Sequence, residues 1–496
     1  MIEGAQSEVG KYDEKEQVNK VVIGVLLVEP DERSPIAKDE EKRLVRKLDR
    51  RIMPMLCILY LLSALDRANL GNARLQGLPR DVLHGDPTGA LFDWANSAFY
   101  FSYVFFLVPV LILSKLCPPR MWLGCMMIGL GLSSTLMASA FNFPGLIVAR
   151  LALGFFEAGF SPSFPVYLSL FYTREEFGFR TASWFMFSAV AGAFGGLIAF
   201  GIQHIHAAIA SWRLLFIVEG VPSILLGILA FKILPDRPEE TSLLTERERE
   251  IAVDRMNRGG SADVGRVLQK KHIAIAFRDW KLYAGGVTYF AANCALSSIQ
   301  GFLPTIIASF GFTDAVAQIL TVPPYMVAAL VLCVTTYASD RLQRRGVFLA
   351  GTNAVAGIGY ILLLVFPSNV GARYFATFCT VAGTYTNIGL ILTWFSHNLG
   401  SETKQAAGIP LYMSIGQCGS ILGSHLFPSP EAPRYIKGFA VTCGLQFLSV
   451  AVALVLATYY VWENRRRDQI YGKPVPDAVV DVSELADEAP DFRYTP

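Results

Sequence analysis

The residues best suited to chemistry in this sequence are ionisable side chains within long apolar stretches. Arg150 and Glu157 stand in the run Val148–Gly159, with Gly154 between them. On a helix these two charges share one face and lie about 10 Å apart. Burying such a charge in a membrane costs on the order of 3 kcal/mol, so it needs a partner or a cavity. This face therefore indicates a functional site, and the alternative is an ion pair that only joins two helices.

A second polar group, Asp66, Arg67 and Asn69, lies near the end of the first apolar stretch. Asp66 and Asn69 share a helix face, whereas Arg67 is turned by about 100° from Asp66. A guanidinium that faces a dry cavity can hold a carboxylate through two parallel hydrogen bonds. The group therefore predicts recognition of an organic anion, and the alternative is an interfacial Asp–Arg pair at the end of the span.

These charges stand out because the chain is apolar overall. Of its 496 residues, 53% are hydrophobic and only 17% are charged. This composition predicts a polytopic membrane protein surrounded by a lipid bilayer. The net charge of +2 argues against binding to nucleic acid. The eight cysteines form no Cys-x-x-Cys pair, so we expect no disulfide framework, no metal site and no cofactor. We also find no nucleophile–base set and no phosphate loop, so an enzyme is not expected.

The apolar runs form two sets of six spans on either side of a charged segment. The expected parts are an N-terminal tail (1–50), a six-helix bundle (51–234), a central loop (235–278), a second six-helix bundle (279–462) and a C-terminal tail (463–496). The central loop has a capping box at Thr245–Glu248, which predicts a short amphipathic helix.

The distribution of lysine and arginine predicts how the chain is oriented. These residues gather beside both tails and the central loop, so we expect all three to be cytoplasmic. The plasma membrane is the expected location, and an internal membrane is the alternative that the sequence leaves open. Two six-helix halves around a charged loop are typical of a secondary transporter with its site at the midplane between them. One such chain suffices for alternating access, so we expect a monomer.

Several motifs carry a more specific signal. They are Asp66-Arg67-x-Asn69, Arg150-x-x-x-Gly154-x-x-Glu157-Ala-Gly, the run Trp212–Gly220, Leu234-Pro-Asp-Arg-Pro-Glu-Glu and Phe302-Leu-Pro-Thr. Together they resemble the major facilitator superfamily, and more narrowly the fungal allantoate/nicotinate-permease branch of its anion:cation symporter family. The resemblance covers about residues 45–470. It implies twelve transmembrane helices in two pseudo-symmetric halves, an all-α integral membrane fold.

The resemblance also implies roles for individual residues. Asp66 and Glu157 match the proton sites of bacterial sugar-acid symporters. Arg67 matches an arginine that contacts the substrate carboxylate, and Tyr103 matches a tyrosine near the substrate. Arg150 matches an arginine that interacts with the first-span aspartate and belongs to the implied substrate site.

One departure from those symporters concerns the substrate. Two residues before the aspartate, where they have a tyrosine, this chain has Ala64. The departure predicts a substrate shaped differently from a polyhydroxy acid.

In the second half, polar and aromatic side chains are candidates for orienting the uncharged part of a substrate. The candidates are Tyr289, Asn293, Tyr385, Asn387 and Trp394. For each of them, packing and hydrogen bonding between helices is an equally weighted alternative.

A charged cluster after the eighth span resembles the superfamily's gating signature. Its members are Asp340, Arg341, Arg344 and Arg345. A solvated basic loop explains Arg344 and Arg345 equally well. The equivalent stretch in the first half, Lys115–Arg120, lacks an acid, which predicts an uneven gate.

The expected function is proton-coupled import of a small organic anion by alternating access. The vitamin or nitrogen-source carboxylates nicotinate and allantoate are examples of the expected substrate, and protons are the expected coupling ion. Export of a metabolite and nutrient sensing without transport are the alternatives that this sequence leaves open.

Overall fold

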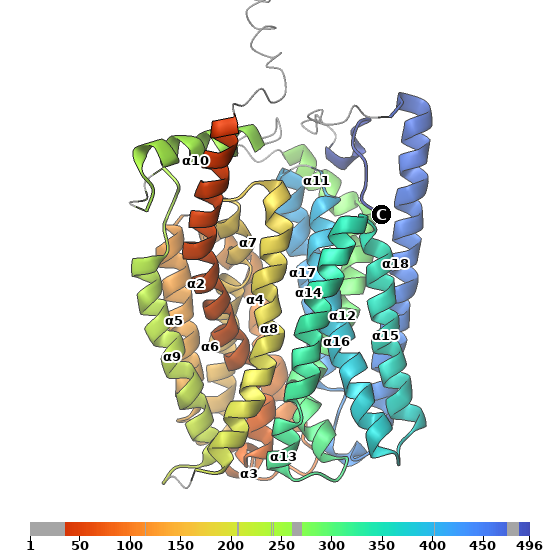
Figure 1. Cartoon of the computed structure of the whole chain (residues 1–496). Coiled ribbons are helices and arrows are strands. Elements are labelled where there is room, and N and C mark those ends of the chain that lie inside the picture. The colour runs from red at the N-terminus through yellow and green to blue at the C-terminus, as the bar shows by residue number, and fades with distance from the viewer. Residues whose placement is uncertain are drawn as a thin grey trace, which may run out of the picture.

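The computed structural model describes residues 35–114, 116–205, 208–239, 241, 243–259, 270–400, 402–473 and 486–496. Parts of the expected tails and loop (1–34, 260–269 and 474–485) and Lys115 lie outside the described residues. The described chain is helical and contains no strand, and nine of its helices are long and apolar enough to cross a membrane. The long helices run side by side along one axis (Figure 1). The all-α membrane fold is thus confirmed.

The first half contains six long helices and two short ones. They are α2 (Pro35–Leu75), α3 (Leu78–Val82), α4 (Ala90–Ser114), α5 (Pro119–Met137), α6 (Phe143–Phe160), α7 (Ser163–Leu168), α8 (Arg174–Gln203) and α9 (Ser211–Ile233). The start of α6 follows from local chemistry. Asn142 accepts a hydrogen bond from the Gly145 backbone N–H at 2.9 Å, and a proline stands in the first turn, where its missing N–H costs nothing.

The second half repeats this pattern. Its helices are α12 (Trp280–Ala308), α13 (Asp314–Ile319), α14 (Val322–Leu342), α15 (Arg345–Val365), α16 (Val370–His397), α17 (Glu402–Ser424) and α18 (Ile436–Tyr471). The expected fourth and eighth spans are each divided in two, as α6 with α7 and as α13 with α14.

Two helices, α10 (Glu246–Gly259) and α11 (Lys270–Arg278), lie between the halves in sequence. The Glu248 carboxylate accepts from the Thr245 backbone N–H at 2.8 Å, which forms half of the capping box. The same carboxylate pairs with Lys47 of α2 at 2.7 Å, and Arg255 of α10 pairs with Glu176 of α8 at 2.9 Å. These ion pairs hold α10 against the first half.

The two ends of the bundle differ. Helices α10 and α11 and the carboxyl terminus lie at one end, here called the tail end, and α3 and α13 lie at the opposite, far end (Figure 1). Helix α2 begins at Pro35, so residues 35–50 are a helical extension of the first span.

The halves touch through side chains of the far part of the bundle. The Asn96 amide on α4 donates to the Ser424 hydroxyl of α17 at 3.0 Å, and Gln318 of α13 donates to the Asn72 carbonyl at 3.3 Å. A Cβ added to Gly71 of α2 would lie 2.5 Å from the Gln300 carbonyl oxygen of α12, so the backbones meet closely there. This conformation is therefore closed at the far end.

Residues 486–496, here called the C-terminal strap, fold back onto the tail end of the second half. The fully buried Asp487 pairs with Lys281 of α12 and with Lys404 of α17, each at 2.5 Å. Trp394 of α16 donates its indole N–H to the Thr495 carbonyl at 2.8 Å. The strap thus connects three helices of one half.

Candidate functional site

Helices α2 and α6 bring together the central charges of the site. The Arg67 guanidinium lies 3.5 Å from the Glu157 carboxylate, which is only 1% exposed. Ser63 donates to the other oxygen of Glu157 at 2.6 Å, and Ser161 donates to the same oxygen that faces Arg67. Three hydrogen-bond donors therefore surround this buried carboxylate.

The Arg67 guanidinium keeps unused hydrogen-bonding capacity. Its Nε has no hydrogen-bond partner among the described residues, and a guanidinium offers five N–H donors. The side chain is 13% exposed. Arg67 is thus held in place by one loose ion pair and can still accept a second anion.

Tyrosines from both halves lie around Arg67. Tyr289 of α12 and Tyr385 of α16 interact electrostatically with the guanidinium, and Tyr103 of α4 interacts with Tyr289. All three rings are buried. The structure therefore places Arg67 and Glu157 beside these three predicted tyrosines, between the two halves.

Two further tyrosines near Arg67 were missed in the sequence analysis. Tyr60 and Tyr100 both interact with its guanidinium. Tyr60, Ser63 and Arg67 lie on one face of α2, because steps of three and four residues return to the same side of a helix. That spacing is the signal that could have found Tyr60.

Arg150 lies next to this group but points toward α4. Its guanidinium donates to the Ala95 carbonyl and to the Asn96 side chain, both at 3.2 Å, and lies over the Phe99 ring. Asp66 instead accepts a hydrogen bond from Ser223 of α9 at 2.8 Å. The Arg150–Asp66 contact that the resemblance implies is not formed in this conformation, in which both residues are described.

The remaining second-half candidates make contacts within that half. Asn387 donates to Asn353 of α15 at 2.8 Å and to Gln446 of α18 at 3.4 Å. Asn293 donates to the Tyr289 carbonyl of its own helix at 2.9 Å, and Trp394 contacts the C-terminal strap. In this conformation the three side chains link helices and backbone, and their contact with a substrate stays a prediction.

The expected gating cluster lies at the tail end, between α14 and α15. Arg345 pairs with Asp340 at 2.8 Å and donates to the Thr393 carbonyl at 2.9 Å. Arg341 lies over the Tyr337 ring, and Arg344 is the N-cap residue of α15 without a side-chain cap hydrogen bond. These contacts join α14, α15 and α16 within the second half, and a role in gating stays a prediction.

The corresponding turn in the first half also contains an ion pair. Arg120 pairs with Asp236 at 2.7 Å. The acid that is missing from the local motif is thus supplied by the loop that follows α9.

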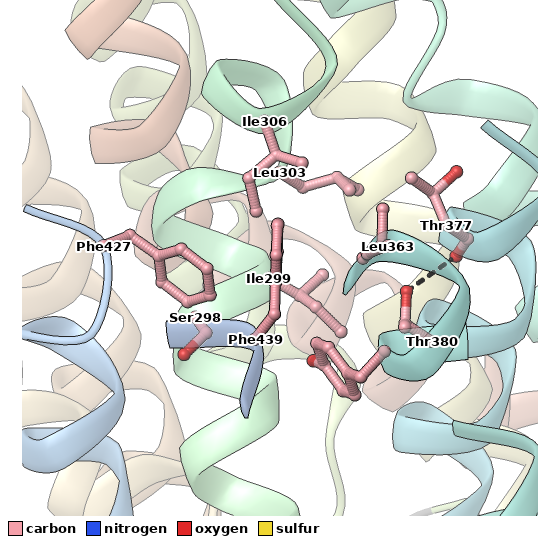
Figure 2. Close-up of a pocket in the computed structure, with 10 residues that line it drawn as sticks. Ser298, Ile299, Leu303, Ile306, Leu363, Thr377, Thr380, Phe427 and Phe439 are labelled. Atoms are coloured by element: carbon pink, nitrogen blue, oxygen red, sulfur yellow. Dashed lines mark hydrogen bonds between the residues drawn. The ribbon is translucent and has the colours of Figure 1, made fainter. Parts of the chain in front are cut away.

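One small cavity lies inside the second half (Figure 2). Its volume is about 10 Å³, enough for roughly one water molecule, and it lies between α12, α15, α16 and α18. Mostly apolar side chains line it, together with Ser298, Thr377 and Thr380. It is too small for an organic anion. Within the described ranges, no cluster of three His, Cys, Asp or Glu side chains is arranged to hold a metal ion.

Comparison with known proteins identifies the family. The pattern of the Major Facilitator Superfamily matches residues 56–424. The chain is also 33% identical over 466 residues to the major facilitator-type transporter hxnP of Emericella nidulans, covering 92% of this chain and 93% of that protein. The chain belongs to the major facilitator superfamily. It is therefore a multi-pass membrane transport protein, as predicted.

Other superfamily members give the same result. The high-affinity nicotinic acid transporter of Saccharomyces cerevisiae is 31% identical over 463 residues, which is 92% of this chain and 85% of that protein. Among solved structures, a bacterial homologue of the human lysosomal transporter Spinster has a TM-score of 0.60 at 14% identity, over 86% of this chain and 97% of that chain. A D-xylose-proton symporter has a TM-score of 0.63 at 12% identity, over 82% and 96%. These two structures support the major facilitator fold.

Proposed function

We propose that this protein imports a small organic anion together with protons. The substrate class is a vitamin or nitrogen-source carboxylate, with nicotinate and allantoate as examples. The observation that carries the proposal is the loose Arg67–Glu157 pair, 3.5 Å long, between the two halves. The resemblance to a nicotinic acid transporter over most of the chain supports a carboxylate as the substrate.

The pair provides a route for coupling. A substrate carboxylate that binds Arg67 competes with Glu157 for the same guanidinium. Glu157 is 1% exposed, and a carboxylate buried without a cation is strongly disfavoured, so it takes up a proton when it loses Arg67. Binding of the anion and binding of the proton then favour each other, and this reciprocal coupling is what symport needs.

The surrounding residues complete the proposal. Tyr103, Tyr289 and Tyr385 lie where they can enclose the rest of the substrate, and Arg150 braces α6 against α4 close to the pair. Asp340 and Arg345 form an ion pair at the tail end that is suited to a gate. In a transport cycle, this gate and the contact between the halves at the far end would open and close in turn.

The proposed orientation places the tail end in the cytoplasm and the protein in the plasma membrane. Five basic side chains of α2 line a groove of about 500 Å³ there: Arg43, Arg46, Lys47, Arg50 and Arg51. Such an excess of positive charge is typical of a cytoplasmic face. A single chain is the proposed working unit.

The test is uptake of labelled carboxylates by purified protein in liposomes, with and without an inward proton gradient. The panel includes nicotinate and allantoate. Accumulation that requires the gradient is the expected result, and a protonophore should abolish it. Protein-free liposomes are the control. If folded protein binds a carboxylate but never transports it, the evidence favours a sensor. If gradient-driven movement is found only outward, it favours an exporter.

A further inference from the structure

A second acidic group lies apart from the Arg67–Glu157 pair. Asp66 on α2 is fully buried, and Glu219 on α9 is 2% exposed. The two carboxyl groups interact across the contact between these helices. Glu219 belongs to the Trp212–Gly220 motif, and neither the expected nor the proposed mechanism assigns it a role.

The hydrogen bonds of this group are incomplete. The Ser223 hydroxyl donates to one carboxyl oxygen of Asp66 at 2.8 Å. It also lies 3.2 Å from the backbone carbonyl oxygen of Glu219. Neither the other oxygen of Asp66 nor either carboxyl oxygen of Glu219 has a hydrogen-bond partner among the described residues. Three acceptor atoms are therefore buried without a donor.

Within the described part of the chain, no cation neutralises these carboxyl groups. Arg67, the neighbour of Asp66 in the chain, forms its ion pair with Glu157 of α6, and Arg150 donates to α4. Helices α5 and α8 have their charged residues at the tail end, as with Arg120 and Arg180. The nearest other charge, Glu157, is of the same sign and raises the cost of ionising Asp66.

We infer that Asp66 and Glu219 form a carboxyl pair that holds at least one proton in this conformation. Two adjacent buried carboxylates without a cation cannot both be ionised. Glu219 is thus a further member of the proton site that the resemblance assigns to Asp66, and this site is separate from Glu157.

Two hydrogen-bond donors next to the pair would also allow it to release this proton. The Asn69 amide lies within reach of Glu219 and the Ser134 hydroxyl lies within reach of Asp66, although neither forms a hydrogen bond of ordinary geometry among the described residues. Both can donate. They would stabilise a carboxylate after the proton leaves, whereas a permanently protonated structural pair would not need them.

This inference deepens the proposed function and rests on it for its role in transport. Asp66 and Arg67 are adjacent on α2, so a movement of α2 that accompanies a change of partner at Arg67 also moves Asp66 relative to Glu219. The substrate site and the carboxyl pair are then connected through one helix. The presence of the shared proton, however, can be tested without any substrate.

The first experiment is infrared difference spectroscopy of the purified protein in lipid, near neutral pH. A protonated carboxyl has a carbonyl stretch that is separate from the carboxylate bands and shifts in D₂O. We expect this signal in the wild type and its loss in the double variant Asp66→Asn/Glu219→Gln. The control Asp93→Asn removes another buried carboxyl, which interacts with Arg74, and should retain the signal.

An undiminished signal in the double variant overturns the inference, whether or not a substrate has been found. Loss of the signal in Asp93→Asn, which leaves Asp66 and Glu219 in place, also overturns the inference. The proposed function is judged separately by the carboxylate panel.

The second experiment uses whichever carboxylate the wild type transports. Glu219→Gln keeps the size and the polarity of the side chain but cannot give up a proton, so we expect loss of gradient-driven accumulation with exchange retained. Unchanged accumulation overturns the coupling role. If this variant fails to fold, Glu219→Asp keeps the carboxyl and should accumulate substrate with a shifted pH profile; a profile identical to that of the wild type counts against the pair.

Discussion

At the scale of single residues, Arg67 determines how this site can respond to an anion. A guanidinium binds a carboxylate through two parallel N–H donors, whereas an ammonium acts as a compact point charge. In the structure, Arg67 uses a 3.5 Å contact to Glu157 while its Nε has no partner among the described residues. Arg150 also keeps one guanidinium nitrogen without a partner among the described residues, but it is anchored by three hydrogen bonds to α4.

Replacing Arg67 by lysine keeps the charge and removes the paired donors. We expect Arg67→Lys to raise the KM for a transported carboxylate by about tenfold or more, because one lost charge-assisted hydrogen bond corresponds to about 1.5 kcal/mol. Initial uptake rates in liposomes measure this effect. Arg466→Lys, at an exposed arginine paired with Glu463, is the matched control. A KM equal to that of the wild type would contradict the two-donor contact.

Replacing Glu157 by glutamine keeps the size of the side chain but removes its charge and its ability to carry a proton. We expect Glu157→Gln to abolish accumulation against a gradient while exchange of labelled for unlabelled substrate continues. Transport assays in both modes measure the difference. Glu250→Gln, at an exposed acid of α10, should leave both modes unchanged. Equal loss of accumulation and exchange in Glu157→Gln would argue for a structural role.

At the scale of helices, close packing sets the distance between the charged side chains. A Cβ added to Gly154 of α6 would lie 2.2 Å from the Phe99 carbonyl oxygen of α4. The face of α6 that carries Arg150 and Glu157 is therefore approached closely by the backbone of α4. The contact between α4 and α6 fixes the positions of Arg150 and Glu157 relative to α4.

Gly154→Ala therefore forces two backbones apart. We expect destabilisation of about 1–3 kcal/mol, the usual cost of overpacking, and a lower Tm in detergent. Gly201→Ala in α8 is the matched control, since nothing lies within 4 Å of a Cβ there and alanine favours a helix. Equal Tm values for Gly154→Ala and the wild type would show that α4 and α6 can separate freely.

The C-terminal strap is a second element-scale contact, and it predicts a pH dependence. Burial raises the pKa of Asp487, but the ion pairs with Lys281 and Lys404 outweigh burial and lower it overall. A lowered pKa in the folded state contributes stability above the ordinary aspartate value of about 4, and this stability is lost as pH falls below it.

We expect Asp487→Asn to lower stability by about 3 kcal/mol near neutral pH, because two buried lysines lose one of the two acids that they pair with and keep only Asp279. The difference from the wild type should narrow below about pH 4, when wild-type Asp487 is itself protonated. Thermal unfolding over a pH series measures both effects. Asp491→Asn, on the exposed part of the strap, is the control. A constant difference at every pH would mean that charge is not the cause.

At the scale of the whole molecule, the fold followed from hydropathy, but the pairing of side chains did not. Apolar runs located the spans because backbone groups in lipid must be satisfied within helices. Arg67 and Glu157 stood out as charges in apolar surroundings. Which side chain each of them meets depends on the rotation of α2 and α6 against their neighbours, and a single helix does not specify that rotation.

The same limit explains what the sequence left open in the second half. From its sequence position, Asn387 could face a cavity or another helix, since its amide can form hydrogen bonds in both environments. The structure shows it hydrogen bonded to Asn353 and Gln446. The Arg120–Asp236 pair and the strap join residues more than 80 positions apart. Local periodicity contains no information about such distant contacts.

Alternating access requires the far end to open. We expect cross-linking of Asn96→Cys with Ser424→Cys, whose native side chains are hydrogen bonded across the halves, to block transport reversibly. Uptake before and after reduction, with the exposed native cysteines replaced by serine, measures this effect. Glu431→Cys with Lys437→Cys, at an ion pair within one half and outside the proposed site, should leave transport intact. Full transport by the cross-linked first pair would rule out opening at this position.

The strap also has a practical consequence for work on this transporter. The last residue of the chain is engaged, because the Pro496 carbonyl accepts a hydrogen bond from the Gly346 backbone N–H at 3.3 Å. An affinity tag or fluorescent protein fused after Pro496 would start next to this hydrogen bond. It would disturb the contact between the strap and the first turn of α15. Expression screens that read such a fusion would measure a disturbed protein, and an amino-terminal tag avoids that disturbance.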